Sequence, residues 1–186
     1  MSDQILWFAA RGAGIVSLLM LTASAAFGLV TVTRFQAAGW PRFFNYEMHR
    51  RVSLLSVAFL ATHVTATILD PYLKLGITAA LVPFASSWRP LPIALGVVSL
   101  HLVVALIATS LLRRRLTLRA WRLVHWSSYA MWPLALAHGL TSGTDALAPW
   151  MVAVEAACLA VVAGAAAWRW LDRDATMTGA PRALAR

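Results

Sequence analysis

Charged residues are scarce in this sequence. Only 12% of its 186 residues are charged and 60% are hydrophobic, and the mean hydropathy is +0.70. Ordinary soluble domains carry about 25% charged residues. A soluble chain of this length keeps roughly 30% of its unfolded surface exposed after folding, and this chain has too few polar groups to cover that surface. The composition therefore excludes a soluble enzyme, a disordered protein and a secreted disulfide scaffold, and it indicates an integral membrane protein.

Cysteine is nearly absent as well, since Cys158 is the only one. A single cysteine excludes an intrachain disulfide, an iron–sulfur site and a cysteine-rich zinc site built from this sequence. The sequence has no C-x-x-C-H motif, which excludes covalent attachment of a c-type haem, and it has no glycine-rich phosphate loop. A haem held by this sequence would therefore be bound non-covalently.

Five apolar runs are candidates for membrane spans, each of which needs about 20 largely apolar residues. We expect an all-α membrane protein in which five transmembrane helices form a bundle, at about residues 5–32, 49–70, 91–112, 121–140 and 148–170. The longest connection has room for a small interfacial helix at residues 75–84. Residues 173–186 are expected to form a flexible tail.

The basic residues predict the orientation. The net charge of +9 would indicate nucleic-acid binding in a soluble protein, but here the charge flanks apolar runs, which is typical of membrane topology. One side of the bundle carries only Arg11, Lys74 and Arg89. Cytoplasmic connections are rich in basic residues, so we expect the N-terminus outside, the C-terminus in the cytoplasm, the plasma or bacterial inner membrane as location, and no nucleic-acid partner. The other side carries 13 arginines: Arg34, Arg42, Arg50, Arg51, Arg113, Arg114, Arg115, Arg119, Arg122, Arg169, Arg173, Arg182 and Arg186.

Histidines inside the apolar runs are the candidate functional residues, because ionisable groups are costly within a membrane. His49 and His63 are 14 residues apart near the second span, and His125 and His138 are 13 apart in the fourth. The two spans run in the same direction, so His49 lies level with His125 near the cytoplasm and His63 level with His138 nearer the outside. At ~1.5 Å per residue the two levels are about 20 Å apart, which is too far for one metal ion.

A pair of haems fits this arrangement, each clamped between one histidine from each helix. Fourteen residues bring a helix back to within about 40° of the same face, whereas 13 residues leave two side chains about 140° apart. We expect Pro133 to kink the fourth span and so to redirect His138. An iron with two histidine ligands has no open position for substrate, which favours electron transfer over ligand activation.

Three stretches of the sequence resemble the ferric reductase-like transmembrane domain family, which includes the membrane halves of ferric reductases and NADPH oxidases. They are HRRVSLLSVAFLATHVTATILD (49–70), VVALIATSLLRRRLTLRAWRLVHWSSYAMWPLALAHGLTSGTD (103–145) and the opening ARGAGIVSLLMLTASAAFGL. The resemblance covers most of residues 7–170 and is strongest to small bacterial members without a fused flavin domain. It implies a membrane domain over residues 1–172 that holds two b-type haems, with His49 and His125 on the inner iron and His63 and His138 on the outer iron.

The function expected from this resemblance is transmembrane electron transfer by a di-haem cytochrome b, acting as the membrane subunit of an oxidoreductase. Because the sequence has no FAD or NADPH domain, a cytoplasmic flavoprotein, a ferredoxin or a quinol is expected to deliver the electrons. The expected acceptor lies outside the membrane and is ferric iron or a redox protein.

Two alternatives stay open at the level of sequence. The first is a quinol-linked cytochrome b subunit that uses His101 in the third span. The second is a haem-free membrane transporter or assembly subunit. Arg11 could pair with a haem propionate or extend to the interface, and Glu155 could be structural or part of a proton path. Glycines of the first span, such as Gly12 and Gly14, are interpreted as helix-packing residues.

Overall fold

A computed structural model describes residues 2–32, 43–73 and 75–177 of the chain. This part is all helical and contains no strand. Lys74, the residues 33–42 and the last part of the expected tail, 178–186, lie outside the described residues. The elements in chain order are α1 (Ser2–Val32), α2 (Phe44–Leu69), α3 (Gly76–Leu81), α4 (Pro90–Leu111), the short 3-10 helix η1 (Arg113–Arg115), α5 (Leu118–Trp126), α6 (Ser128–Ser142) and α7 (Pro149–Met177).

Four of the described helices are long and apolar enough to cross a membrane: α1, α2, α4 and α7. They correspond to the first, second, third and fifth expected spans, and they make the chain a multi-pass membrane protein. The fourth expected span, 121–140, is different. It is divided between α5, with 9 residues, and α6, with 15 residues, so neither helix alone has the length of a span. The small helix expected within 75–84 is present as α3.

The division between α5 and α6 falls at Ser127, six residues before Pro133, so the kink expected at the proline is wrong in its position. Pro133 stays inside α6. The Ser127 hydroxyl donates to the Val124 carbonyl at 2.7 Å, and the Ser127 N–H bonds to the same oxygen at 2.9 Å. These bonds close a tight three-residue turn in place of the next α-helical bond, and serine side chains that bond back to the helix often bend it.

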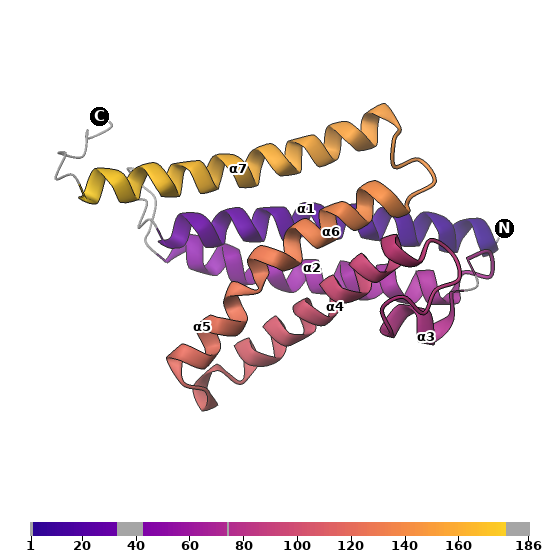
Figure 1. The fold of residues 1–186 in the computed structure, drawn as a ribbon, viewed down its shortest axis with the longest axis horizontal. Helices are drawn as coiled ribbons and strands as arrows, with labels where there is room; N and C mark the ends of the chain where they lie inside the picture. Colours follow the sequence, from indigo (N-terminus) through magenta and orange to yellow (C-terminus); the bar gives the residue numbers. More distant parts are fainter. Residues whose placement is uncertain (1, 33–42, 74, 178–186) are drawn as a thin grey trace.

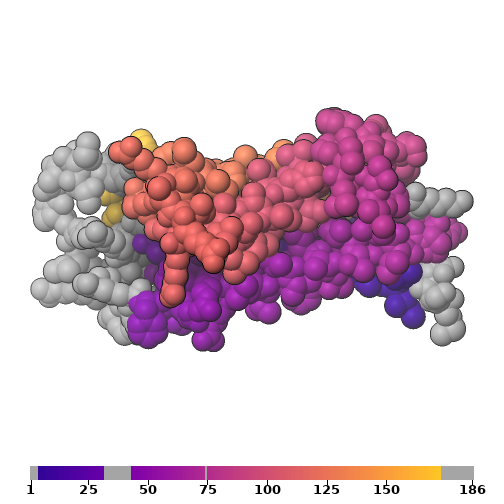
Figure 2. All heavy atoms as spheres, turned by 90° about the horizontal axis from the view of Figure 1, so that it is seen from below, coloured from indigo at the N-terminus to yellow at the C-terminus, as the bar shows by residue number. Residues whose placement is uncertain are grey.

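The helices form two pairs that are joined through α1. α1 packs along α2, α4 packs along α6, and α1 also contacts α6 and α7. Figure 1 shows α1 and α2 side by side along the long axis, with α7 on one side and α4 crossing on the other; α1 begins and α7 ends at opposite ends of the bundle. Figure 2 shows the bundle from below, where α2 forms one long strip of the face and α3, α4 and α5 form the strip beside it.

A small core holds the two pairs together. Its buried residues come from α1, α4, α6 and α7, and the Trp132 indole N–H donates to the Thr22 hydroxyl at 3.0 Å across it. Most apolar side chains point outward instead, as Phe8, Leu54 and Val104 do with 65%, 59% and 56% of their surface exposed. Such an outward apolar surface is stable when lipid covers it. The buried core residues are Leu18, Leu21, Val103, Met131, Trp132, Leu136 and Cys158.

Candidate functional site

The four histidines of the second and fourth expected spans lie in two pairs. The ring centroids of His49 and His125 are 6.2 Å apart with the rings at 75° to each other. Those of His63 and His138 are 6.3 Å apart with the rings at 77°. His49 and His63 come from α2, His125 from α5 and His138 from α6. The fold therefore brings together one histidine from each half of the bundle at each of two positions.

His63 is oriented by the backbone of α1. Its Nδ1–H donates to the carbonyl of Ala10 at 2.6 Å. Because a carbonyl oxygen only accepts, Nδ1 carries the proton and Nε2 keeps a free lone pair. The ring also lies against Gly14, where a Cβ atom would come within 2.8 Å of Nδ1. Glycine at this position is what allows the ring to reach the helix backbone.

His49 is held in the same way one repeat further along α1. Its Nδ1–H donates to the carbonyl of Ser24 at 2.8 Å, and its ring lies against Gly28, where a Cβ would be 3.5 Å from the ring. The hydroxyls of Ser24 and Ser53 are 2.6 Å apart, which ties α1 to α2 beside the ring. His49 also keeps its Nε2 lone pair free for a ligand bond.

His138 repeats the arrangement on α4. Its Nδ1 lies 2.8 Å from the carbonyl of Pro92 and 2.9 Å from the hydroxyl of Ser142. A Cβ on Gly96 would come within 2.7 Å of the ring. Nδ1–H therefore donates to Pro92, and Nε2 is again the free nitrogen.

A single rule unites these three sites: the accepting carbonyl stands four residues before the glycine that the ring touches. In an α-helix the residue at i+4 bonds to the carbonyl of residue i, so its side chain lies beside that oxygen. A glycine there opens the oxygen to a side chain from another helix. The interpretation of Gly14 as a packing residue alone is therefore incomplete. Gly14 and Gly28 are 14 residues apart, the spacing of His63 and His49, and this shared spacing was the available sequence signal.

His125 is held differently. Its Nδ1 is buried and has no hydrogen-bond partner among the described residues. Its ring instead stacks on the indole of Trp121, with centroids 4.6 Å apart and an angle of 18° between the planes. The Arg113 guanidinium lies 5.0 Å from the centre of the Trp121 ring.

Two cavities border the His63/His138 pair. The larger, of about 210 Å³, is lined by side chains of α1 and of the α6–α7 connection, and by Asp70 and Trp88. The smaller, of about 100 Å³, is lined by residues of α3 and α4, including Ala79 and Val97. Both cavities reach His63 and His138. Apolar space therefore extends on two sides of this pair of rings.

Arg11 lies at the end of the larger cavity and has protein partners of its own. It forms an ion pair with Asp145, and its guanidinium carbon lies 5.4 Å from the Trp7 ring centre and 5.8 Å from that of Trp150. Asp145 was not considered at the sequence level because it lies in a connection, 134 residues from Arg11. The pair links α1 to the segment that joins α6 and α7.

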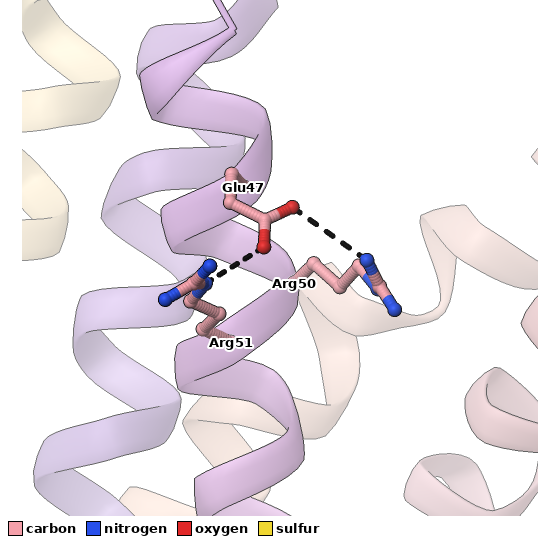
Figure 3. Close-up of polar contacts among 3 residues, drawn as sticks. All are labelled: Glu47, Arg50 and Arg51. Atoms are coloured by element: carbon pink, nitrogen blue, oxygen red, sulfur yellow. Dashed lines mark hydrogen bonds and ion pairs between the residues drawn. The ribbon is translucent and has the colours of Figure 1, made fainter.

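The arginines beside His49 also have a partner in the chain. Figure 3 shows Glu47 between them: its carboxylate accepts from Nε of Arg51 at 2.7 Å and lies 3.6 Å from Arg50. The side chains of Arg50 and Arg51 are 62% and 69% exposed. Exposed ion pairs of this kind contribute little to stability.

The remaining candidates lie away from the histidine pairs. His101 is on an exposed face of α4. Glu155 of α7 is buried, with 2% of its surface exposed, and neither carboxyl oxygen has a hydrogen-bond partner in the described part of the chain. It packs against Gly139, the neighbour of His138. Arg122 is exposed on α5.

A comparison with protein families identifies the fold's relatives. The family model described as ferric reductase like transmembrane component matches residues 13–136, about two thirds of the chain. The chain belongs to this family. In this ferric reductase-like protein, His49, His63 and His125 fall inside the matched range and His138 lies just beyond it. Membership suggests electron transfer in the membrane, and domains of the family often bind haem. Neither the curated proteins nor the solved structures contain a match to the chain.

Proposed function

We propose that this ferric reductase-like protein is a di-haem cytochrome b that transfers electrons across the membrane. His49 and His125 would hold the iron of one b-type haem, and His63 and His138 the iron of the other. Residues 1–172 would form the haem-binding membrane domain, with the His49/His125 pair nearer the cytoplasm. When bound, the two haems supply one-electron transfer between the two faces of the membrane.

The separation of the rings is the observation that carries this proposal. A metal–imidazole bond is about 2 Å long, so two imidazoles that bind one ion from opposite sides have ring centroids roughly 6.4 Å apart. The measured separations are 6.2 and 6.3 Å. Buried histidines that only bonded to neighbouring helices would have no reason to keep this spacing at two positions.

The ligand set fits a haem better than a bare ion. No group of three or more histidine, cysteine, aspartate or glutamate residues suited to a metal occurs in the described part of the chain. Each histidine pair therefore supplies two protein ligands, which is what a haem iron accepts because the porphyrin provides the rest. The apolar cavities on both sides of the His63/His138 pair suit a flat apolar ring.

The protein's own groups would fix the ligands and keep water away. Backbone carbonyls of Ala10, Ser24 and Pro92 hold the Nδ1 protons, so Nε2 of each ring is ready to bind iron. Hydrogen bonds of this kind raise the basicity of the ligand and fix its orientation. The surrounding apolar side chains lower the local polarity, which together with these bonds would set the reduction potentials.

The partners on each side follow from the proposed orientation. A flavoprotein, a ferredoxin or a quinol would donate electrons at the cytoplasmic end. Ferric iron or a redox protein would accept them at the other end. His101 lies on an exposed face of α4, so the described structure offers no enclosed quinol site around it.

Absorption spectra of the full chain purified in detergent, oxidised and reduced with dithionite, test the proposal. We expect about two low-spin b-type haems per chain. His49→Ala and His63→Ala should each remove one haem, and the double variant should remove both. His101→Ala is the matched control and should keep two. A featureless spectrum from protein expressed with ample haem would refute the proposal and favour the haem-free transporter or assembly subunit.

A further inference from the structure

Three of the four paired histidines are oriented by a backbone carbonyl, and the fourth is not. Nδ1 of His125 is buried without a hydrogen-bond partner in the described structure. Histidines that bind metals almost always donate their second ring N–H to an acceptor. This asymmetry, which is confined to one of the two pairs, requires another way of holding the His125 ring.

The α4 backbone cannot serve His125 as it serves His138. Fourteen residues after Pro92 and Gly96 stand Leu106 and Ser110, so the glycine is missing from the second position. The Leu106 carbonyl lies 3.3 Å from the hydroxyl of Thr109, which donates to it. In addition, the division of the helix at Ser127 places His125 on α5, outside the register that sets His138 over Pro92.

An aromatic stack occupies the place of the missing hydrogen bond. Trp121 lies one helical turn before His125, and the two rings are nearly parallel at 4.6 Å. The Arg113 guanidinium covers the indole at 5.0 Å from its centre. The indole Nε1 is itself buried without a partner among the described residues, so Trp121 meets the histidine through its ring face and not through its N–H.

We propose that Trp121 is a positioning residue for His125, held in turn by Arg113. The stack fixes the rotation of the imidazole that a carbonyl fixes at the other three sites. This inference rests on the proposed function, since its consequence concerns the haem at the His49/His125 pair. Without an acceptor at Nδ1, His125 is a less basic ligand, and the nearby positive charge of Arg113 favours the reduced iron. Both effects raise the reduction potential of that haem.

Redox titration of the purified, haem-loaded chain tests the inference, with low-spin electron paramagnetic resonance spectra as a second readout. In Trp121→Leu we expect the midpoint potential of one haem to fall and its resonance signal to shift, because the freed ring gains other acceptors and Arg113 loses its position. Trp121→Phe keeps an aromatic face and should lie nearer the wild type. The haem affected should be the one that His49→Ala removes.

Trp126→Leu is the matched control, because Trp126 is on the same helix, is 61% exposed and makes no stack with His125. It should leave both potentials unchanged. Arg113→Gln, compared with Arg114→Gln, gives a second test that does not alter the helix face, and only Arg113→Gln should lower the potential. These two variants and Trp121→Phe decide the matter should Trp121→Leu fail to fold.

Unchanged potentials and resonance signals in all the Trp121 and Arg113 variants would overturn the inference. Equal shifts of both haems would also overturn it, because they would indicate a general structural effect. Either result in a chain that carries two haems leaves the proposed function intact. A wild-type chain without haem would instead refute the proposed function itself.

Discussion

At the residue scale, the orientation of each histidine depends on small residues in the helix beside it. Gly14 and Gly96 leave the Ala10 and Pro92 carbonyls open to His63 and His138. A helix carbonyl is otherwise covered by the side chain one turn later. A metal-binding pair in a helical bundle therefore needs glycines in the neighbouring helices as much as it needs the histidines.

The glycines predict a graded series of alanine variants. Gly14→Ala and Gly96→Ala would place Cβ 2.8 and 2.7 Å from histidine rings, whereas Gly28→Ala would place it at 3.5 Å, an ordinary contact. Overpacking costs about 1–3 kcal/mol, so the first two variants should unfold several degrees lower and lose the haem of the His63/His138 pair.

Haem content per chain and the thermal midpoint in detergent measure this series. Gly28→Ala should keep two haems. Gly12→Ala is the control, because a Cβ at Gly12 would meet nothing within 4 Å. Equal haem retention by Gly12, Gly14 and Gly96 variants would show that the close approach to the rings is not needed.

The histidine pairs were predictable from sequence, and their supports were not. Two spans of the same direction with nearly equal histidine spacing suffice to place His49 beside His125 and His63 beside His138, because helix rise is constant. The accepting carbonyls have no sequence signature of their own. Asp145 likewise gives no signal, since its pairing with Arg11 depends on how the α6–α7 connection returns to α1.

At the element scale, the division between α5 and α6 resolves the 13-residue spacing of His125 and His138. On a continuous helix these side chains would point about 140° apart, yet each lies beside a histidine of the single helix α2. The proline predicted an irregular helix, and the local bonds of Ser127 decide where it occurs. Sequence alone could not choose between the two positions, because either one changes the direction of the chain.

Straightening this segment should cost one haem. Ser127→Ala with Pro133→Ala removes the competing hydroxyl and restores a donor for the Tyr129 carbonyl. A continuous helix would turn His125 away from His49 while His138 keeps its bond to Pro92. Haem content should therefore fall from about two per chain to about one, and the remaining haem should disappear when His63→Ala is added.

Thr141→Ala is the control for this variant, since the Thr141 hydroxyl also bonds back to its own helix, at 2.6 Å from the Ala137 carbonyl, away from the division. The single variants Ser127→Ala and Pro133→Ala separate the two contributions. Two haems with a wild-type spectrum in the double variant would mean that tertiary packing, and not the local sequence, divides the helix.

At the scale of the whole molecule, the two histidine pairs lie toward opposite ends of a bundle whose apolar surface faces outward. The His63/His138 pair is near the start of α1, and the His49/His125 pair is near the end that carries the arginines of η1 and α5. The direction of electron transfer therefore depends on which end faces the cytoplasm, and the distribution of arginine predicts that the end with η1 and α5 does.

Single-cysteine labelling in intact cells tests this orientation. Cys158 is 2% exposed, and Cys158→Ala gives a background without cysteine. A membrane-impermeant maleimide should then label Tyr72→Cys and Leu147→Cys, whose native side chains are 87% and 84% exposed, without lysis. Leu118→Cys, at the opposite end, should react only after lysis.

The result decides the energetics as well as the topology. In a cell whose interior is negative, moving one electron outward is favoured by about 2.3 kcal/mol per 100 mV of membrane potential. With the predicted orientation, electrons that enter at the His49/His125 pair and leave at the His63/His138 pair move in that favoured direction. Labelling of Leu118→Cys without lysis, together with protection of Tyr72→Cys, would reverse the orientation. The same pairs would then carry electrons inward against the potential, and a cytoplasmic donor would have to act at the His63/His138 end.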